Sequence, residues 1–279
     1  MADAAKLPPS NIVQRVVTGL ILAPIVLAAV YLGGLAFTIL ALLMAGLGIS
    51  EFYILAQNRA SQGSTLIGIP TMIALALAFQ TGNFILLLAI LGIGAVVTFV
   101  LETLRHSTDL RRTLFQVGMT VFGVLYVGFP AAALITLRAL PNGIVWILLV
   151  FCVTWGTDSF AYIGGRLWGK TPLAPTISPK KTLEGAIVGV IGGIIPSLIL
   201  LSAANLITLG TTTFVFIAPF VAIVGDLFES WLKRFFEVKD SHITGLNLLP
   251  GHGGILDRTD ALLLVSMFAY VVLMLAGLR

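Results

Sequence analysis

The chain has 279 residues, of which 58% are hydrophobic and only 10% are charged. Soluble domains carry about 25% charged residues, so this composition excludes a soluble globular protein and indicates one embedded in a lipid bilayer. The net charge of +4 is small and gives no indication of a nucleic-acid partner. Cys152 is the single cysteine of the sequence, which excludes an intrachain disulfide and a zinc site built on cysteines.

Apolar runs of roughly 20 residues recur along the chain, and a helix of that length crosses a bilayer. An open sheet cannot span lipid, and these runs lack the alternating pattern of barrel strands. The sequence therefore predicts an all-α, polytopic integral membrane helix bundle that forms a single membrane domain over residues 1–279. We expect about nine transmembrane helices, at residues 16–32, 35–57, 64–80, 83–101, 113–137, 143–164, 184–204, 212–232 and 260–278.

The first four predicted spans contain almost no ionisable group apart from Glu51. A lone carboxylate near a helix end is as compatible with a snorkelling or paired side chain as with a functional one, and no role is assigned to Glu51. Chemically versatile residues concentrate later in the chain. We therefore expect residues 1–140 to form lipid-facing scaffold helices, and residues 141–279 to provide the catalytic helices and cytosolic loops.

The positive charges predict how the chain is oriented in the membrane. If the N-terminus is cytoplasmic, every Lys and Arg except Arg138 and Arg279 falls on the cytoplasmic side, which satisfies the positive-inside rule. The loops after the sixth and eighth spans then lie together in the cytosol. These two loops are also the richest in polar residues.

The sixth span and the loop after it, TPLAPTISPKKTLEG, carry a first set of candidate residues. Asp158 lies inside the apolar run, where an unpaired carboxylate is costly, so it is either a hydrogen-bonded structural group or part of a site. Ser178, Lys180 and Lys181 offer donors suited to phosphate oxygens, although the two lysines, taken alone, are better explained as anchors of the loop at lipid headgroups. Glu184 opens the next helix, where an anion complements the helix dipole.

The eighth span ends in VGDLFESWLKR, where Asp226, Glu229 and Lys233 recur at i, i+3 and i+7 along one helical face. They form either a surface salt-bridge ladder or part of a site. The seventh span is rich in glycines that permit close helix approach, at Gly185, Gly189, Gly192 and Gly193.

The segment PGHGGILDRTD leads into the ninth span. Its glycines, which include Gly253 and Gly254, let the backbone approach a ligand closely. Asp257 and Asp260 follow at i and i+3 on one helical face. Asp257 could be the N-cap of the span with Asp260 completing the cap, a role that does not exclude metal binding.

Together these residues favour phosphate chemistry. Carboxylates without cysteine suit Mg²⁺, with Mn²⁺ possible, rather than zinc. Basic residues beside such a metal neutralise charge on transferring phosphoryl groups. The sequence has neither GxxxxGK[ST] nor a GxGxxG that follows a strand, which excludes a soluble nucleotide-binding fold. We interpret the pattern as Mg²⁺-dependent transfer on a phosphorylated lipid at the cytosolic membrane face.

Two motifs resemble the signature of the phosphatidate cytidylyltransferases, also called CDP-diacylglycerol synthases. They are SxxKRxxxxKD at residues 230–240 and PGHGGxxDRxD at residues 250–260. The SPKKTLEG loop and the TDSFAYIGGRLWGK segment also match, so the resemblance covers about residues 154–260. Nine residues separate Asp240 from Pro250, about four more than in the family pattern, which puts the placement of Lys239 and Asp240 in question.

The resemblance implies the reaction CTP + phosphatidic acid → CDP-diacylglycerol + pyrophosphate, a step of phospholipid biosynthesis in which the lipid phosphate attacks the α-phosphorus of CTP. The partners implied are CTP, phosphatidic acid and the bilayer, and a homo-oligomer is left open. A phosphate monoester is already largely ionised near neutral pH, so no essential general base is expected. We expect the protein in the inner (cytoplasmic) membrane, with its active-site loops in the cytosol.

The resemblance also implies roles for individual residues. The carboxylates expected to hold the metal are Asp226 and Asp257, supported by Asp158 and Asp260. Catalysis is expected to depend on Asp226, Asp257, Lys233, Arg258 and Asp260. The residues expected to bind the CTP and lipid phosphates or to shape the loop over the nucleotide are Ser178, Lys180, Lys181, Glu184, Arg234, Lys239, His252, Gly253 and Gly254.

Three other interpretations stay open on the sequence. A CTP-dependent polyprenol or lipid kinase of similar architecture would need the same kinds of residues. An ion-coupled transporter could use Asp158 and Asp226 as an ion path, although no inverted repeat of broken helices is visible. A purely structural membrane protein would have little use for acidic residues inside its spans.

Overall fold

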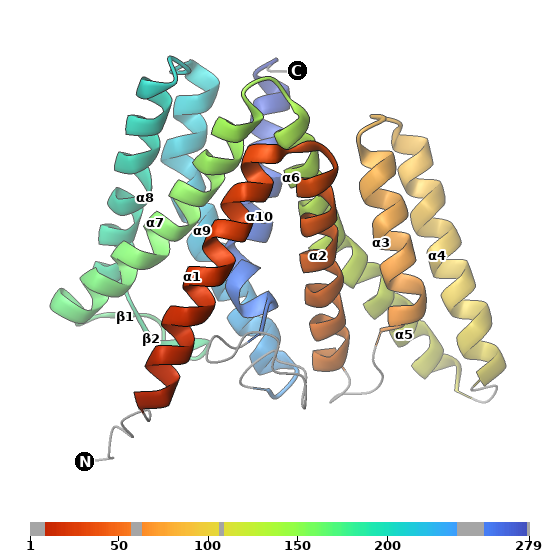
Figure 1. Ribbon diagram of the computed structural model, residues 1–279. Coiled ribbons are helices and arrows are strands. Elements are labelled where there is room, and N and C mark those ends of the chain that lie inside the picture. Colours follow the sequence, from red (N-terminus) through yellow and green to blue (C-terminus); the bar gives the residue numbers. More distant parts are fainter. Residues whose placement is uncertain (1–8, 57–62, 106–108, 239–253, 278–279) are drawn as a thin grey trace, which may run out of the picture.

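The chain folds as a bundle of long helices that cross the molecule side by side (Figure 1). The computed structural model describes residues 9–56, 63–105, 109–238 and 254–277. In chain order its helices are α1 (Pro9–Leu32), α2 (Gly34–Ala56), α3 (Thr65–Phe79), α4 (Phe84–Arg105), α5 (Leu110–Gly123), the π-helix η1 (Val124–Gly128), α6 (Phe129–Ala139), α7 (Gly143–Trp168), α8 (Leu183–Ala203), α9 (Leu209–Phe235) and α10 (Leu256–Leu275).

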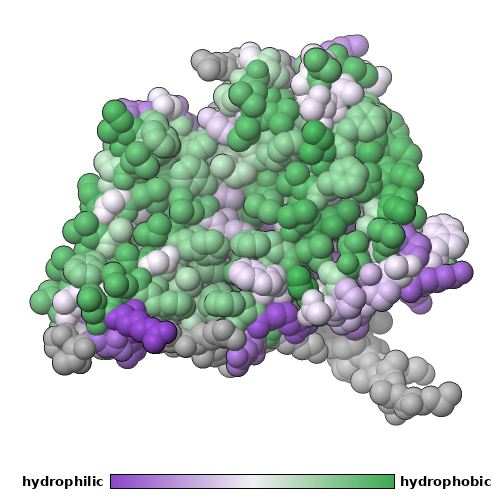
Figure 2. Space-filling model, turned by 180° about the vertical axis from the view of Figure 1, so that it is seen from behind, coloured by the Kyte–Doolittle hydropathy of each residue, from purple (hydrophilic) through white to green (hydrophobic). Residues whose placement is uncertain are grey.

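Seven helical stretches in the described part of the chain are long and apolar enough to cross a membrane, with α5, η1 and α6 counted as the single stretch Leu110–Ala139. Two shorter apolar helices, Thr18–Leu32 and Thr65–Phe79, accompany them. Hydrophobic side chains cover most of the face shown in Figure 2, and hydrophilic ones gather along its lower edge. The predicted all-α, multi-pass membrane bundle is therefore confirmed. Each predicted span overlaps a helix, while the number that cross the bilayer stays a prediction.

The helix ends and turns are divided between the two ends of the bundle (Figure 1). The start of α1, the end of α2, the end of α9 and the start of α10 lie at the lower end of the view. The α1–α2, α3–α4, α6–α7 and α8–α9 turns lie at the upper end. The elements predicted to carry the site therefore share one end with the start of α1, as the charge count requires. That this end faces the cytosol stays a prediction.

A small hairpin lies between α7 and α8, where the sequence predicted a loop stiffened by prolines. Strand β1 (Pro172–Ala174) pairs antiparallel with β2 (Ser178–Thr182), with Ala174 opposite Ser178. Helix α8 follows at once, because the Thr182 side chain accepts a hydrogen bond from the Gly185 amide at 3.1 Å and caps the helix. The hairpin is thus fixed to the start of α8.

Helices α7 and α8 pack with their backbones in close approach. A Cβ atom on Gly189 would lie 2.7 Å from the Thr157 carbonyl oxygen, a distance that no real side chain tolerates. The glycine-rich seventh predicted span therefore does what its composition predicted.

Two hydrophobic clusters form the core. One joins α7 to α9 and α10 through residues such as Trp146, Phe214 and Val265, all at most 2% exposed. The other contains Phe52 of α2 and Met72 of α3, and it extends to the ends of α9 and α10 through the side chains of Leu232, Phe236 and Leu256. The N-terminal helices are therefore packed directly against the elements that carry the candidate site.

Arg138, one of the two positive charges expected on the far side, has a structural contact there. Its guanidinium donates to the carbonyl oxygens of Val30 at 2.6 Å and Tyr31 at 3.0 Å, at the C-terminal end of α1. A cation at this position satisfies terminal carbonyls and complements the helix dipole.

Candidate active site

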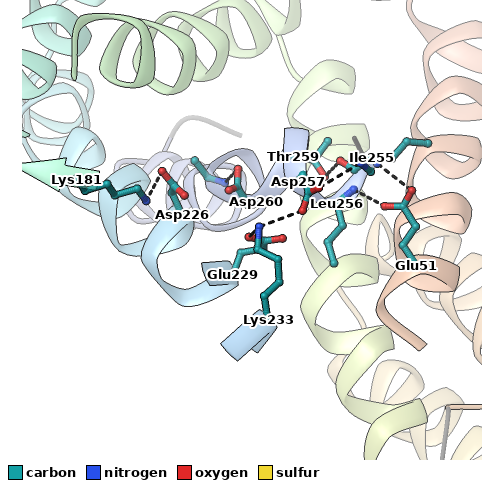
Figure 3. Close-up of polar contacts among 12 residues, drawn as sticks. Glu51, Lys181, Asp226, Glu229, Lys233, Ile255, Leu256, Asp257, Thr259 and Asp260 are labelled. Atoms are coloured by element: carbon teal, nitrogen blue, oxygen red, sulfur yellow. Dashed lines mark hydrogen bonds and ion pairs between the residues drawn. The ribbon is translucent and has the colours of Figure 1, made fainter. Parts of the chain in front are cut away.

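Gly225 brings α9 and α10 into contact at the centre of the candidate site. A Cβ atom there would lie 3.0 Å from the Ala261 Cα and 3.1 Å from the Asp260 carbonyl oxygen. Any side chain at this position would force the neighbouring backbone to move, so glycine favours the close approach. As a result, Asp226 on α9 and Asp260 on α10 lie next to each other (Figure 3).

We call the first set of charges the Asp226 group: Asp158, Lys181, Asp226 and Asp260. The Lys181 ammonium forms an ion pair with the Asp226 carboxylate, and their side chains are 26% and 30% exposed. Asp158 on α7 interacts electrostatically with both Asp226 and Lys181, and Asp260 interacts with the other three. Carboxylates from three helices thus lie near one lysine, and one of them, Asp226, forms an ion pair with it.

Lys181 reaches this group because of the strand on which it lies. Successive side chains of a strand point to opposite faces. Lys181 is half-buried against Asp226, whereas its neighbour Lys180 is exposed. The structure therefore separates two lysines that the sequence treated as equivalent.

We call the second set the Lys233 group: Glu229, Lys233 and Asp257. The Lys233 ammonium lies 2.5 Å from Glu229 Oε2 and 3.1 Å from Asp257 Oδ1. The Glu229 side chain is only 1% exposed, and those of Lys233 and Asp257 are 17% and 13% exposed. A surface salt-bridge ladder is therefore the wrong interpretation of this helical face.

The two groups divide the predicted metal ligands. Asp226 lies with Asp158 and Asp260, while Asp257 contacts Lys233 and accepts a hydrogen bond from the Gly254 amide at 3.2 Å. Asp257 is not an N-cap, because α10 begins at Leu256 and Asp257 belongs to its first turn.

Glu51 on α2 occupies the start of α10 and is the residue that the sequence interpretation left without a role. Its Oε1 accepts a hydrogen bond from the Ile255 amide at 2.9 Å, and its Oε2 accepts one from the Leu256 amide at 2.7 Å (Figure 3). Glu51 is 3% exposed. The available signal was its isolation, because a single carboxylate in an apolar span requires a partner.

Glu184 and Arg234 hold the hairpin in place. The Glu184 carboxylate accepts hydrogen bonds from the Lys170 amide at 3.0 Å and the Thr171 hydroxyl at 2.9 Å. Arg234 donates through Nε to the carbonyl oxygen of Ile177 at 3.3 Å, which ties the hairpin to the end of α9. Their expected part in substrate binding stays a prediction.

The other predicted residues vary in how they are placed. Ser178 is half-buried on β2, Gly254 is buried, and Arg258 is exposed on the first turn of α10. Three further predicted residues lie outside the described residues: Lys239, His252 and Gly253.

Tyr126 is a second residue that the sequence interpretation missed. It belongs to η1 and is 7% exposed, and its hydroxyl has no hydrogen-bond partner among the described residues. It interacts electrostatically with Glu229, Asp260 and Asp226. Single π-helical turns occur frequently at functional sites, but the sequence alone gave no sign of this one.

The comparisons with known proteins agree with this picture. Residues 13–276 match the Cytidylyltransferase family. A phosphatidate cytidylyltransferase of Brucella abortus biovar 1 is 34% identical over 272 residues, which cover 94% of this chain and 93% of that protein. A protein of the same name from Bacillus subtilis strain 168 is 34% identical over 278 residues, covering 94% and 97%. One from Staphylococcus epidermidis is 32% identical over 262 residues, covering 93% and 98%. The chain belongs to the cytidylyltransferase family.

Proposed function

We propose that the protein is a phosphatidate cytidylyltransferase, which makes CDP-diacylglycerol and pyrophosphate from CTP and phosphatidate. The observation that carries the proposal is the pairing of two lysine–carboxylate groups at one end of a membrane bundle. The family match and the relatives of that name over almost the whole chain support it.

The reaction is a phosphoryl substitution with balanced bonds. A phosphate oxygen of the lipid forms a bond to the α-phosphorus of CTP, and the bond from that phosphorus to the α–β bridging oxygen breaks. The electron pair leaves with pyrophosphate. Because the lipid phosphate is already ionised, the protein need only position the reactants and neutralise charge.

The lysines of the two groups suit the second task. Lys181 and Lys233 each lie against carboxylates of the protein. We propose that substrate phosphates approach the Asp226 group, in which the Lys181 and Asp226 side chains are 26% and 30% exposed and the Lys181 Nζ atom itself is buried against Asp226. Lys233 is held by two carboxylates, and it would stabilise the site by joining α9 to α10.

The residues present fit a hard divalent cation. Among the described residues no three His, Cys, Asp or Glu side chains form a cluster that could hold a metal ion by itself. Mg²⁺ nevertheless suits the neighbouring Asp226 and Asp260, with Asp158 in support, because it binds through one or two carboxylates plus substrate phosphates and water. When bound, Mg²⁺ (or Mn²⁺) supplies positive charge that offsets the triphosphate.

The location follows from the substrates. Phosphatidate is held in the bilayer and CTP is dissolved in the cytosol, so the end of the bundle that carries both groups would face the cytosol. With bacterial relatives, the membrane proposed is the inner membrane.

The test is direct. Purified protein in detergent, given labelled CTP, phosphatidate and Mg²⁺, should release pyrophosphate and form labelled CDP-diacylglycerol. Chelation with EDTA should stop turnover, and added Mg²⁺ should restore it. Turnover of CTP with a polyprenol but none with phosphatidate would assign the protein to lipid kinases instead.

A further inference from the structure

A buried carboxylate from the N-terminal half of the chain holds the first turn of α10. Both oxygens of Glu51 accept backbone hydrogen bonds, from Ile255 at 2.9 Å and from Leu256 at 2.7 Å. The next residue, Asp257, contacts Lys233 on α9. Only one peptide unit separates the residues bound by Glu51 from a residue of the candidate site.

Glu51 also occupies a position at which a helix attracts anions. The first amides of a helix have no partner within the helix, and together with the helix dipole they attract anions, including phosphates. Glu51 fills that position with a carboxylate that is 3% exposed. Two of the amides at the start of α10 are therefore already bound by a carboxylate of the protein.

The surroundings of Glu51 are closely packed. Its neighbours on α2, Phe52 and Tyr53, are fully buried. Phe52 packs edge-on against Phe236 at the end of α9, with ring centroids 6.2 Å apart. The helix that provides the carboxylate is thus locked to the helix that provides Lys233, so Glu51 can fix the position of α10 relative to α9.

We infer that Glu51 is a positioning residue of the reaction, acting through the first turn of α10. It holds Asp257 against Lys233 and keeps Asp260 beside Asp226. The inference rests on the proposed cytidylyltransferase function. It also assigns a catalytic requirement to a helix that the sequence places in the scaffold.

The first test is Glu51→Gln, which keeps the size of the side chain. A carboxamide can accept from one of the two amides, but its own N–H groups then face the other, so one contact is lost. A small displacement of reacting groups costs up to about 100-fold in rate. We expect kcat to fall about 10- to 100-fold, with the KM values for CTP and phosphatidate within about two-fold of wild type, because Glu51 is buried and its carboxylate binds backbone amides.

Glu102→Gln is the matched control. Glu102 is also 3% exposed and also lies near the end of an N-terminal helix, but its carboxylate pairs with Arg105 on the same helix at 3.3 Å. It should keep kcat within about two-fold of wild type. Equal losses of kcat in the two variants would show that Glu51 acts through general stability, and would overturn the inference.

Hydrogen–deuterium exchange gives a measurement that does not depend on activity. In Glu51→Gln the amides of Ile255 and Leu256 should exchange at least about three-fold faster, because local protection depends on these hydrogen bonds. Exchange in the cores of α7 and α8 should not change. Faster exchange throughout the bundle would contradict a positioning role. Exchange at the start of α10 that is unchanged from wild type would also contradict it.

Glu51→Asp keeps the test decisive if the glutamine variant does not fold. It retains the charge and shortens the side chain by one methylene, so we expect a folded protein with kcat about 3- to 10-fold below wild type. Wild-type kcat in this variant would overturn the inference. A wild-type protein that does not turn over CTP with phosphatidate would instead contradict the proposed function, whatever the exchange measurement shows.

Discussion

The Asp226 group and the Lys233 group are built from the same residue types but differ in how open they are. In the first, the paired side chains are 26% and 30% exposed, and three carboxylates share one lysine. In the second, Lys233 is held by two carboxylates, of which Glu229 is 1% exposed. An open group with excess negative charge can accept a cation and phosphates. A buried and nearly balanced group is suited to holding two helices together.

The comparison predicts that the two groups respond differently to the loss of one charge. Asp226→Asn should reduce turnover by at least about 1,000-fold, because it removes a proposed ligand of the metal that would offset charge on the triphosphate. Its free energy of unfolding should fall less than when a fully buried pair is broken, because the Asp226 side chain is 30% exposed even though the Lys181 Nζ atom is buried. Assays with radiolabelled CTP and denaturation in mixed micelles measure the two quantities. A variant with normal turnover would remove Asp226 from the metal site.

In the Lys233 group, the loss of one charge should reduce stability more strongly than in the Asp226 group. Lys233→Met leaves Glu229 and Asp257 facing each other with no cation between them, and breaking a buried ion pair costs about 3–5 kcal/mol. We expect the unfolding free energy to fall by about 3 kcal/mol, and turnover to fall with it. SDS titration of the purified variant measures the loss. Stability equal to that of Asp226→Asn would abolish the distinction between the two groups.

Adjacent lysines of β2 provide a sharper test of the open group. Lys181→Ala removes the cation that contacts Asp226, so the KM for CTP should rise about 10-fold. Lys180→Ala, on the exposed face of the same strand and outside the Asp226 group, should raise the KM by less than Lys181→Ala does, although the sequence predicted that both lysines bind phosphate. Each variant is the control of the other, because both lie on one short strand. An equal rise in both would favour a diffuse attraction of anions over a specific contact.

The sequence predicted the bundle well, because apolar runs long enough to span a bilayer dictate helices. Within the site it predicted which residues matter better than how they pair. Asp226 and Glu229 share a helical face, yet they belong to different groups because the hairpin brings Lys181 to one of them. The hairpin depends on strand pairing between residues for which the sequence predicted a loop.

Helix boundaries explain a second difference. The sequence placed the start of the last span at residue 260, whereas α10 begins at Leu256, and this moves Asp257 from a cap into the first turn. The cap comes from Glu51, 204 positions earlier than Ile255. A contact across such a separation depends on tertiary packing and cannot be inferred from local pattern.

The smallest effect is expected at Tyr126, which interacts electrostatically with carboxylates of both groups. Its hydroxyl is buried and has no hydrogen-bond partner among the described residues, while its ring packs against Phe122 and Phe228. An unpaired buried hydroxyl costs about 1–3 kcal/mol, and removing it is neutral or stabilising. Tyr126→Phe should therefore keep the unfolding free energy or raise it by up to about 1 kcal/mol. A loss of more than about 1 kcal/mol would show that the hydroxyl has a bonding partner.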